Sequence, residues 1–198
     1  KMLIKKVMGR QVPSGKLPAD VGCVVSNTST AKAISDAIQK GMPLVERAVS
    51  VTGDFIRNPG NYMVKLGTNV QELIDHCGGI TGDDVVLKMG GPMMGAPLKD
   101  TNVPIIKGSN GVIAIAADHT EEKECIKCGR CVDVCPMELQ PLEIYKYGQL
   151  GDAEKLLTLN VMDCFSCKCC EYICSSKIPL VSKINAAKGL VMPLLKKK

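Results

Sequence analysis

The chain of 198 residues has very few aromatic side chains: no tryptophan, four tyrosines and two phenylalanines. Single-stranded nucleic acids bind largely by stacking their bases on aromatic rings, so the formal charge of +5 does not indicate a nucleic-acid partner. No apolar run approaches the ~18 residues of a membrane-spanning helix, and no secretory signal with an apolar core is visible. These absences favour a protein that is soluble or peripheral to a membrane.

Cysteine, by contrast, is abundant, with eleven residues, eight of which form two copies of one spacing. The first motif is Cys125-x-x-Cys128-x-x-Cys131-x-x-x-Cys135 followed by Pro136, and the second is Cys164-x-x-Cys167-x-x-Cys170-x-x-x-Cys174. This is the ligand pattern of proteins that hold two [4Fe-4S] clusters. Three thiolates at steps of three residues let a short loop wrap one cluster, while the fourth thiolate faces away from it.

The fourth cysteine of each motif binds the other cluster in two-cluster ferredoxins. The spacing therefore predicts two crossed ligand sets. The first cluster is expected on Cys125, Cys128, Cys131 and Cys174, and the second on Cys164, Cys167, Cys170 and Cys135. Such a crossing would lock the two motifs together.

Other uses of these cysteines fit less well. Eleven is an odd count, which disfavours a disulfide framework. A zinc site needs four ligands, usually as two separated pairs, and requires neither a third cysteine at the same step nor a following proline. The second motif departs from the first because Ser175 replaces the proline and Cys169 adds a thiol beside Cys170. The three-residue step favours Cys170 as the ligand, with Cys169 as the alternative.

The N-terminal quarter of the chain is expected to contain one strand and one helix. Residues 1–20 are rich in Lys, Gly and Pro and indicate extended, turning chain. An apolar run at 21–26, centred on Cys23, predicts a buried strand, and the polar residues 27–30 can cap a helix over 31–40. Its apolar residues share one face, which predicts packing against a sheet: Ala31, Ile34, Ala37 and Ile38.

Residues 49–89 indicate a β-grasp-like unit. Two strands, 49–56 and 62–66, flank a turn in which Gly60 can supply a positive φ. A helix follows, with Thr68 and Gln71 at capping-box spacing, and a further strand is expected at 85–89. The apolar face of that helix is formed by Val70, Leu73, Ile74 and Cys77.

The remaining elements follow in order. The glycine-rich loop 90–95 lacks the lysine and hydroxyl of a phosphate loop and is interpreted as a tight crossing. A strand at 112–117 and a polar linker at 118–124 lead into the cysteine motifs. Between the motifs, helices are expected at 142–147 and 152–159, and after them a helix that uses Leu180, Ile184 and Ala187 and ends before Gly189.

Further motifs, spread over nearly the whole chain, resemble those of the RnfC family, the C subunits of Rnf-type ion-translocating NAD:ferredoxin oxidoreductases. They are Pro13-Ser14-Gly15, Leu17-Pro18-Ala19-Asp20-Val21-Gly22, Gly41-x-Pro43-Leu44, Val51-Thr52-Gly53-Asp54, Pro59-Gly60-Asn61-Tyr62, Gly90-Gly91-Pro92-Met93-Met94-Gly95 and Cys135-Pro136. The resemblance implies an α+β chain in three parts. These are the tail of an α/β flavin domain (1–47), an SLBB β-grasp domain with a returning strand (48–117), and a mostly helical ferredoxin-type domain with two [4Fe-4S] clusters (118–198).

The resemblance also implies a function. Single electrons would pass between FMN and NAD(H), bound by a more N-terminal part of a longer protein, and the membrane subunits of a complex that translocates Na⁺ or H⁺. The chain would then lie at the cytoplasmic face of the bacterial membrane as a peripheral subunit. Asn27 and Thr28 are candidates for FMN contacts, with helix capping as the simpler role. Because no phosphate-binding glycine loop precedes Val21, the chain by itself is not expected to oxidise NADH.

Two other functions compete with this one. A cobalamin-reductase subunit of the propanediol-utilisation type resembles RnfC through the same domains. A binding or scaffold module, whose clusters only brace the fold, belongs to a different class. Reversible one-electron reduction of the clusters would distinguish an electron relay from a scaffold with purely structural clusters. In a relay, the cations beside the ligands, Lys127, Arg130 and Lys168, are expected to raise the cluster potentials.

Overall fold

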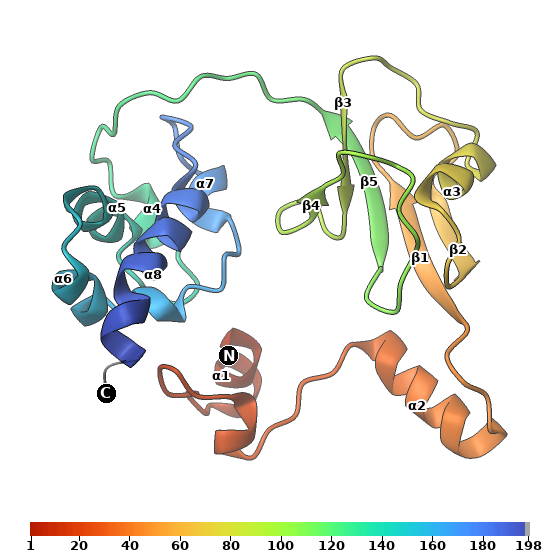
Figure 1. The fold of residues 1–198 in the computed structure, drawn as a ribbon, viewed down its shortest axis with the longest axis horizontal. Helices are drawn as coiled ribbons and strands as arrows, with labels where there is room; N and C mark the ends of the chain where they lie inside the picture. Colours follow the sequence, from red (N-terminus) through yellow and green to blue (C-terminus); the bar gives the residue numbers. More distant parts are fainter. Residues whose placement is uncertain (197–198) are drawn as a thin grey trace. The chain divides into compact units, whose positions relative to one another are not determined.

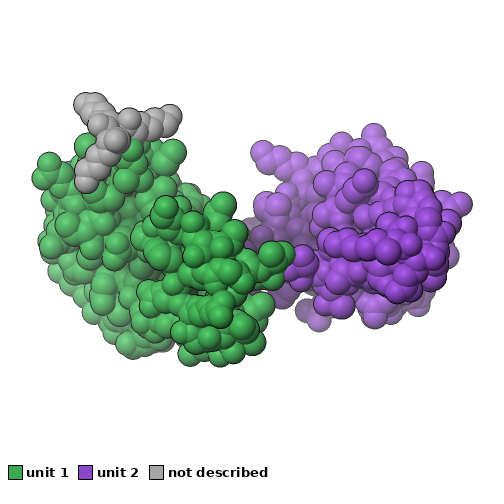
Figure 2. All heavy atoms as spheres, turned by 90° about the horizontal axis from the view of Figure 1, so that it is seen from below, with its two compact units in different colours: residues 1–25, 120–198 green, residues 26–119 purple. Residues whose placement is uncertain are grey.

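The computed structural model describes residues 1–196, and the chain divides into two compact units. One unit, the sheet unit, comprises Ser26–His119, and the other, the helical unit, comprises Lys1–Val25 with Thr120–Lys198 (Figure 2). The chain contains both helices and a β-sheet, which confirms the predicted α+β class. The division into 1–47, 48–117 and 118–198 stays a prediction.

The sheet unit is built on a five-stranded sheet with the order β2-β1-β5-β3-β4 (Figure 1). Strands β1 (Glu46–Thr52) and β2 (Gly60–Lys65) form an antiparallel hairpin. Strand β5 (Gly111–Ala116) runs parallel to β1 and antiparallel to β3 (Val85–Met89). Strand β4 (Ala96–Pro97) closes the edge beside β3. Side chains alternate along β1 between buried and exposed, so this strand has one face on the core.

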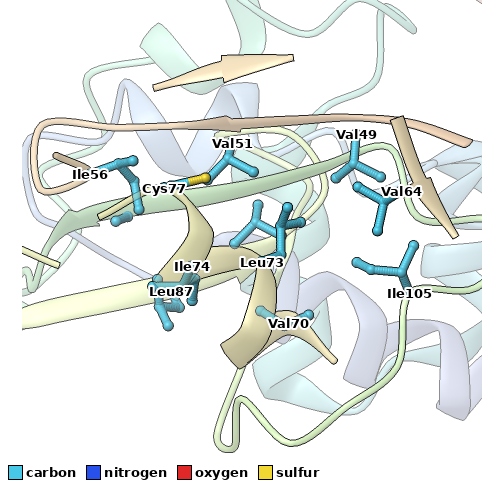
Figure 3. Packing of buried hydrophobic residues seen from close by; sticks show 12 residues of the cluster. Val49, Val51, Ile56, Val64, Val70, Leu73, Ile74, Cys77, Leu87 and Ile105 are labelled. Atoms are coloured by element: carbon cyan, nitrogen blue, oxygen red, sulfur yellow. The ribbon is translucent and has the colours of Figure 1, made fainter. Parts of the chain in front are cut away.

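Helix α3 (Val70–His76) supplies the other side of that core. The predicted apolar face of this helix is confirmed, since Val70, Leu73, Ile74 and Cys77 are at most 4% exposed. Figure 3 shows them opposite Val49 and Val51 of β1, and Val64, Leu87 and Ile105 belong to the same cluster. Cys77 is therefore a packing residue, as its place on the helix predicts.

The connection between β1 and β2 differs from the predicted turn. β1 ends at Thr52 rather than Ile56, and Gly60 is already the first residue of β2, paired with Val51. The positive φ of this connection belongs to Gly53, at 116°. The predicted capping box is also wrong, because Asn69 precedes the helix without a side-chain cap. The backbone N–H groups of Val70 and Gln71 instead donate to carbonyls of the loop 101–103.

The N-terminal predictions need correction as well. Residues 2–8 form helix α1 (Met2–Met8), whose Ile4 is buried, and a short 3₁₀ turn, η1, spans Pro18–Val21. The run 21–26 is not a strand, since it pairs with nothing in the described chain and Val24 is 90% exposed. Cys23 is accordingly only half-buried. Backbone N–H groups at its start donate locally instead, Gly22 to the Ala19 carbonyl and Cys23 to the Pro18 carbonyl, so the run does not need a strand partner there.

Helix α2 (Thr28–Lys40) forms close to where it was predicted, and the Asn27 side chain caps it by accepting from the Ser29 N–H at 2.9 Å. Its apolar face does not pack on the sheet as predicted, because Ile34 and Ile38 are 52% and 79% exposed. The loop 90–95 does connect adjacent strands tightly, joining β3 to β4, and Met94 on it is exposed.

Besides α1, the helical unit contains short helices within the cysteine motifs and further helices between and after the motifs. Helices α5 (Pro141–Leu150) and α6 (Ala153–Thr158) lie between the motifs, as predicted, and the turn η2 spans Val161–Asp163. Helix α8 (Leu180–Lys196) packs against α5 and α6 and continues through Gly189 and Pro193, beyond its predicted end. Over residues 1–196, every helix is too short or too polar to cross a membrane.

Gly53 provides a test of the sheet unit. A Cβ at this position would overlap the carbonyl of Ala114 in β5, and φ is positive. We expect Gly53→Ala to destabilise the unit by about 2–5 kcal/mol. Gly67→Ala is the control, since Gly67 also has positive φ but nothing within 4 Å, and about 1–2 kcal/mol is expected. Hydrogen exchange of the β1 and β5 amides measures both values, and equal losses would contradict the packing at Gly53.

Candidate iron–sulfur site

The two cysteine motifs have the same backbone, with each position in the first motif repeated 39 residues later. Helix α4 (Arg130–Asp133) begins two residues after the second cysteine of its motif, and helix α7 (Cys169–Tyr172) begins at the same place in the other. Left-handed backbone recurs at three matched pairs of positions: Lys127 and Ser166, Gly129 and Lys168, Glu138 and Lys177. The structure therefore contains one loop shape, built twice.

This loop shape is costly to form. Of the six left-handed residues, only Gly129 is a glycine, and each of the others costs roughly 1–2 kcal/mol. The shape turns backbone N–H groups toward the sulfurs: the N–H of Arg130 hydrogen-bonds to Cys128, and that of Cys169 to Cys167. Leu139 N–H donates to Cys135 Sγ at 3.4 Å. Such N–H···S bonds stabilise negative charge on sulfur, which is the form that binds iron.

Two cavities lie beside these loops, and each is lined by four of the eight motif cysteines. The first cavity, of about 390 Å³ including space open to solvent, is lined by Cys125, Cys128, Cys131 and Cys174. The second cavity, of about 380 Å³ on the same measure, is lined by Cys135, Cys164, Cys167 and Cys170. In both cavities, three cysteines come from one motif and the fourth from the other. This is the grouping that the crossed assignment predicts.

The alternative ligand Cys169 does not line the second cavity, whereas Cys170 does and is 7% exposed. Cys169 is the first residue of α7 and corresponds in the repeat to Arg130, so its position matches that of a non-ligand. Cys23 and Cys77 lie outside both cavities, Cys77 in the core of the sheet unit. The geometry thus favours Cys170, and the ligand assignment itself stays a prediction.

The residues fit a four-iron cluster. All eleven cysteines are free thiols, and the remaining lining of both cavities is largely apolar. Within residues 1–196, no three His, Cys, Asp or Glu side chains are grouped to hold one metal ion. A cube differs from a single ion in this respect, since its four thiolates each bind a different iron atom.

Burial controls how readily these thiols ionise. It raises the pKa of Cys170 to about 12, together with the charges of Cys164, Cys167 and Cys135 across the same cavity. Burial also raises the pKa of Cys131 and of Cys167. The Arg130 backbone N–H lowers the pKa of the exposed Cys128 thiol. If Cys170 binds iron, as predicted, it would have to lose a tightly held proton when the second cavity is loaded, because iron binds thiolates.

Two polar anchors of the motifs were not found by sequence reasoning. The half-buried Lys188 Nζ, on α8, donates to the carbonyl of Cys164 at 2.7 Å. The buried Ser176 hydroxyl donates to the carbonyl of Glu124 at 2.9 Å. Both side chains bind a backbone carbonyl far away in the sequence. Neither the spacing of motifs nor the composition could therefore have predicted these contacts.

The flavin candidates, Asn27 and Thr28, lie far from the cysteine motifs in the sequence. They stand at the start of α2, in the sheet unit, where the Asn27 side chain caps the helix. The capping role is therefore confirmed for Asn27. A flavin contact there stays a prediction.

Comparisons with known proteins agree with this site. The 4Fe-4S dicluster domain matches residues 124–178, the SLBB domain residues 48–97, and the Nuo51 FMN-binding domain residues 1–36. An ion-translocating oxidoreductase complex of Rhodobacter capsulatus has a C subunit that is 44% identical over 96% of this chain and 37% of its own length. The chain belongs to the RnfC family. The SLBB domain and the two-cluster domain that the resemblance implied are thereby confirmed.

Two further RnfC relatives differ in the ion that their names give. The proton-translocating ferredoxin:NAD(+) oxidoreductase complex of Clostridium ljungdahlii has a C subunit that is 45% identical over 75% of this chain and 33% of its own. The C subunit of the Na(+)-translocating complex of Acetobacterium woodii is 41% identical over 95% of this chain and 43% of its own. The chain therefore spans less than half the length of these relatives.

The cavity geometry predicts unequal thiol reactivity in the reduced, cluster-free protein. Cys128 is exposed and its pKa is lowered, whereas the Cys170 thiol is buried with a pKa of about 12. At pH 8 we expect iodoacetamide to modify Cys128 at least about tenfold faster than Cys170, because the thiolate is the nucleophile. Mass spectrometry of early time points measures the two rates. Protein unfolded in urea is the control, in which the difference should disappear, and equal rates in the folded protein would refute the burial of Cys170.

Proposed function

We propose that the chain is an iron–sulfur electron relay of an Rnf-type NAD:ferredoxin oxidoreductase. It would carry single electrons between an NADH and FMN site and the membrane subunits that translocate Na⁺ or H⁺. The observation that carries this proposal is the pair of four-cysteine cavities, each closed by a thiol from the other motif. When bound there, two [4Fe-4S] clusters each accept and donate one electron.

The cavities are adjacent along the same two helices. Residues Pro141 and Ile144 of α5 line the second cavity, and their chain neighbours Leu142 and Tyr145 line the first. On α8, Leu180 lines the first cavity and the next residue, Val181, lines the second. The two cavities are therefore neighbours along both helices, which favours electron transfer from one cluster to the other.

The protein would supply the environment of the clusters rather than the redox chemistry. Apolar residues of α5 and α8 limit water around each cavity, and the N–H groups of Arg130 and Cys169 bind sulfur. These two features act in opposite directions on the reduction potential. Hydrogen bonds to sulfur stabilise the added electron and raise the potential, whereas a dry site makes added negative charge more costly and lowers it.

Partners and location follow from the relatives and are part of the proposal. The relatives' names describe subunits of translocating complexes. The match of residues 1–36 to an FMN-binding domain supports FMN and NADH binding by a longer protein, with the chain as one part of the electron path. A peripheral position at the cytoplasmic face of the membrane is consistent with the absence of a spanning helix among residues 1–196.

Iron content and reduction test the relay. Anaerobically reconstituted protein is expected to hold roughly eight iron and eight sulfide per chain and to be reduced reversibly by dithionite, with bleaching of its visible absorption. Metal and sulfide analysis and a redox titration measure these properties. About four iron, or stoichiometric zinc without visible absorption, would contradict two cubes. Clusters that cannot be reduced reversibly would favour the scaffold module.

The crossed ligand sets predict which cluster each substitution damages. Cys135→Ala should disturb the cluster on Cys164, Cys167 and Cys170 more than the other, because Cys135 lines the second cavity. Cys174→Ala should do the reverse, because Cys174 lines the first cavity. EPR spectra of the reduced variants distinguish the two clusters. If each substitution instead disturbed the cluster of its own motif, the ligands would not be crossed.

A further inference from the structure

Lys188 makes a contact with the second cysteine motif that differs in charge from the corresponding contact in the first motif. Its Nζ donates to the carbonyl oxygen of Cys164, the first cysteine of the second motif, at 2.7 Å. The corresponding end of the first motif is held by a neutral group, the Ser176 hydroxyl, which donates to the carbonyl of Glu124 at 2.9 Å. One cavity therefore has an ammonium group bound to the backbone of a ligand cysteine, and the other has a hydroxyl beside its ligand.

The ammonium of Lys188 is placed where its charge is poorly screened. Lys188 is half-buried on α8, next to Ala187 at 2% exposure and one turn before the fully buried Val191. The effective dielectric constant is lower at such a position than in water, so the charge acts over a longer range. Lys127 and Arg130, beside the first cavity, are exposed to solvent, which screens their charge more strongly.

The carboxylate beside Cys164 in the sequence has a cation of its own. Asp163, which precedes Cys164, forms an ion pair with Lys1 at 3.2 Å. Adding an electron to a cluster makes it more negative, so a nearby cation stabilises the reduced form and raises the reduction potential.

We propose that Lys188 is a positioning residue that fixes the Cys164 end of the second motif and raises the reduction potential of the cluster in the second cavity. The inference rests on the proposed function, because it requires a reducible cluster at this site. It adds a residue that sets the difference between the two clusters, and so the cluster on which an electron resides. Lys188 acts through the backbone of a ligand cysteine and is not itself a ligand.

Three substitutions test this role in the reconstituted chain of residues 1–198. Lys188→Met removes the charge and the hydrogen bond, Lys188→Gln removes the charge and keeps a donor, and Lys188→Arg keeps both. Lys183→Met is the control, since Lys183 is an exposed lysine on the same helix. EPR-monitored redox titration measures both midpoints, and the cluster in the second cavity is the one disturbed by Cys135→Ala.

We expect Lys188→Met and Lys188→Gln to lower the ratio of reduced to oxidised cluster in the second cavity about three- to tenfold at a fixed potential. A tenfold change corresponds to a midpoint shift of about 59 mV for a one-electron couple. The other midpoint should change much less, Lys188→Arg should retain the wild-type value, and Lys183→Met should shift neither.

Unchanged midpoints in both neutral variants, or an equal shift from Lys183→Met, would overturn the inference. So would a loss of the second cluster in both neutral variants that Lys188→Arg does not restore, because the positive charge would then not be what matters at this position. These outcomes are separate from a failure of the relay itself, in which the wild-type chain would lack roughly eight iron or would not be reduced reversibly.

Discussion

Each cysteine cavity of the helical unit is closed by a thiol that belongs to the other motif. Cys174 completes the first cavity and Cys135 the second, although a long stretch of sequence separates each from most of its cavity partners. Neither cavity can form unless the two motifs meet. The helices α5, α6 and α8 bring them together, and their apolar residues join the cysteines in one buried cluster. The packing of these helices is therefore a requirement of both sites at once.

The same requirement explains how the loops tolerate their strain. Lys168 adopts the left-handed conformation that a glycine, Gly129, adopts in the other motif. This conformation is unfavourable for lysine. It is held because the residues on either side are fixed, with Cys170 buried against α8 and the Cys164 carbonyl bound by Lys188. Strain of this kind persists only where the surroundings determine the backbone, which is typical of functional sites.

Sequence reasoning found the parts of this chain that depend on local spacing. The cysteine steps, the apolar face of α3 and the strand β3 all follow from periodicity within a few turns or residues. It failed where the outcome depends on a partner. The run 21–26 has strand composition but pairs with nothing in the described chain, and the apolar face of α2 is exposed. Likewise, the positive φ falls at Gly53 rather than Gly60, and Gly53 is also where β5, distant in the sequence, leaves no room for a side chain.

The two side chains that hold the cysteine motifs, Lys188 and Ser176, could not be predicted from the sequence either. No spacing rule connects Lys188 to Cys164, or Ser176 to Glu124, since the members of each pair are far apart in the sequence and meet only in the folded unit. Yet these contacts make the surroundings of the two cysteine motifs different in charge. Two nearly identical loops with identical ligands would give two nearly equal potentials. A difference in potential would favour one direction of electron transfer, whereas clusters that only brace the fold would gain nothing from it. The difference between the Lys188 ammonium and the Ser176 hydroxyl, together with two cavities that are neighbours along α5 and α8, therefore fits the proposed electron relay better than a scaffold.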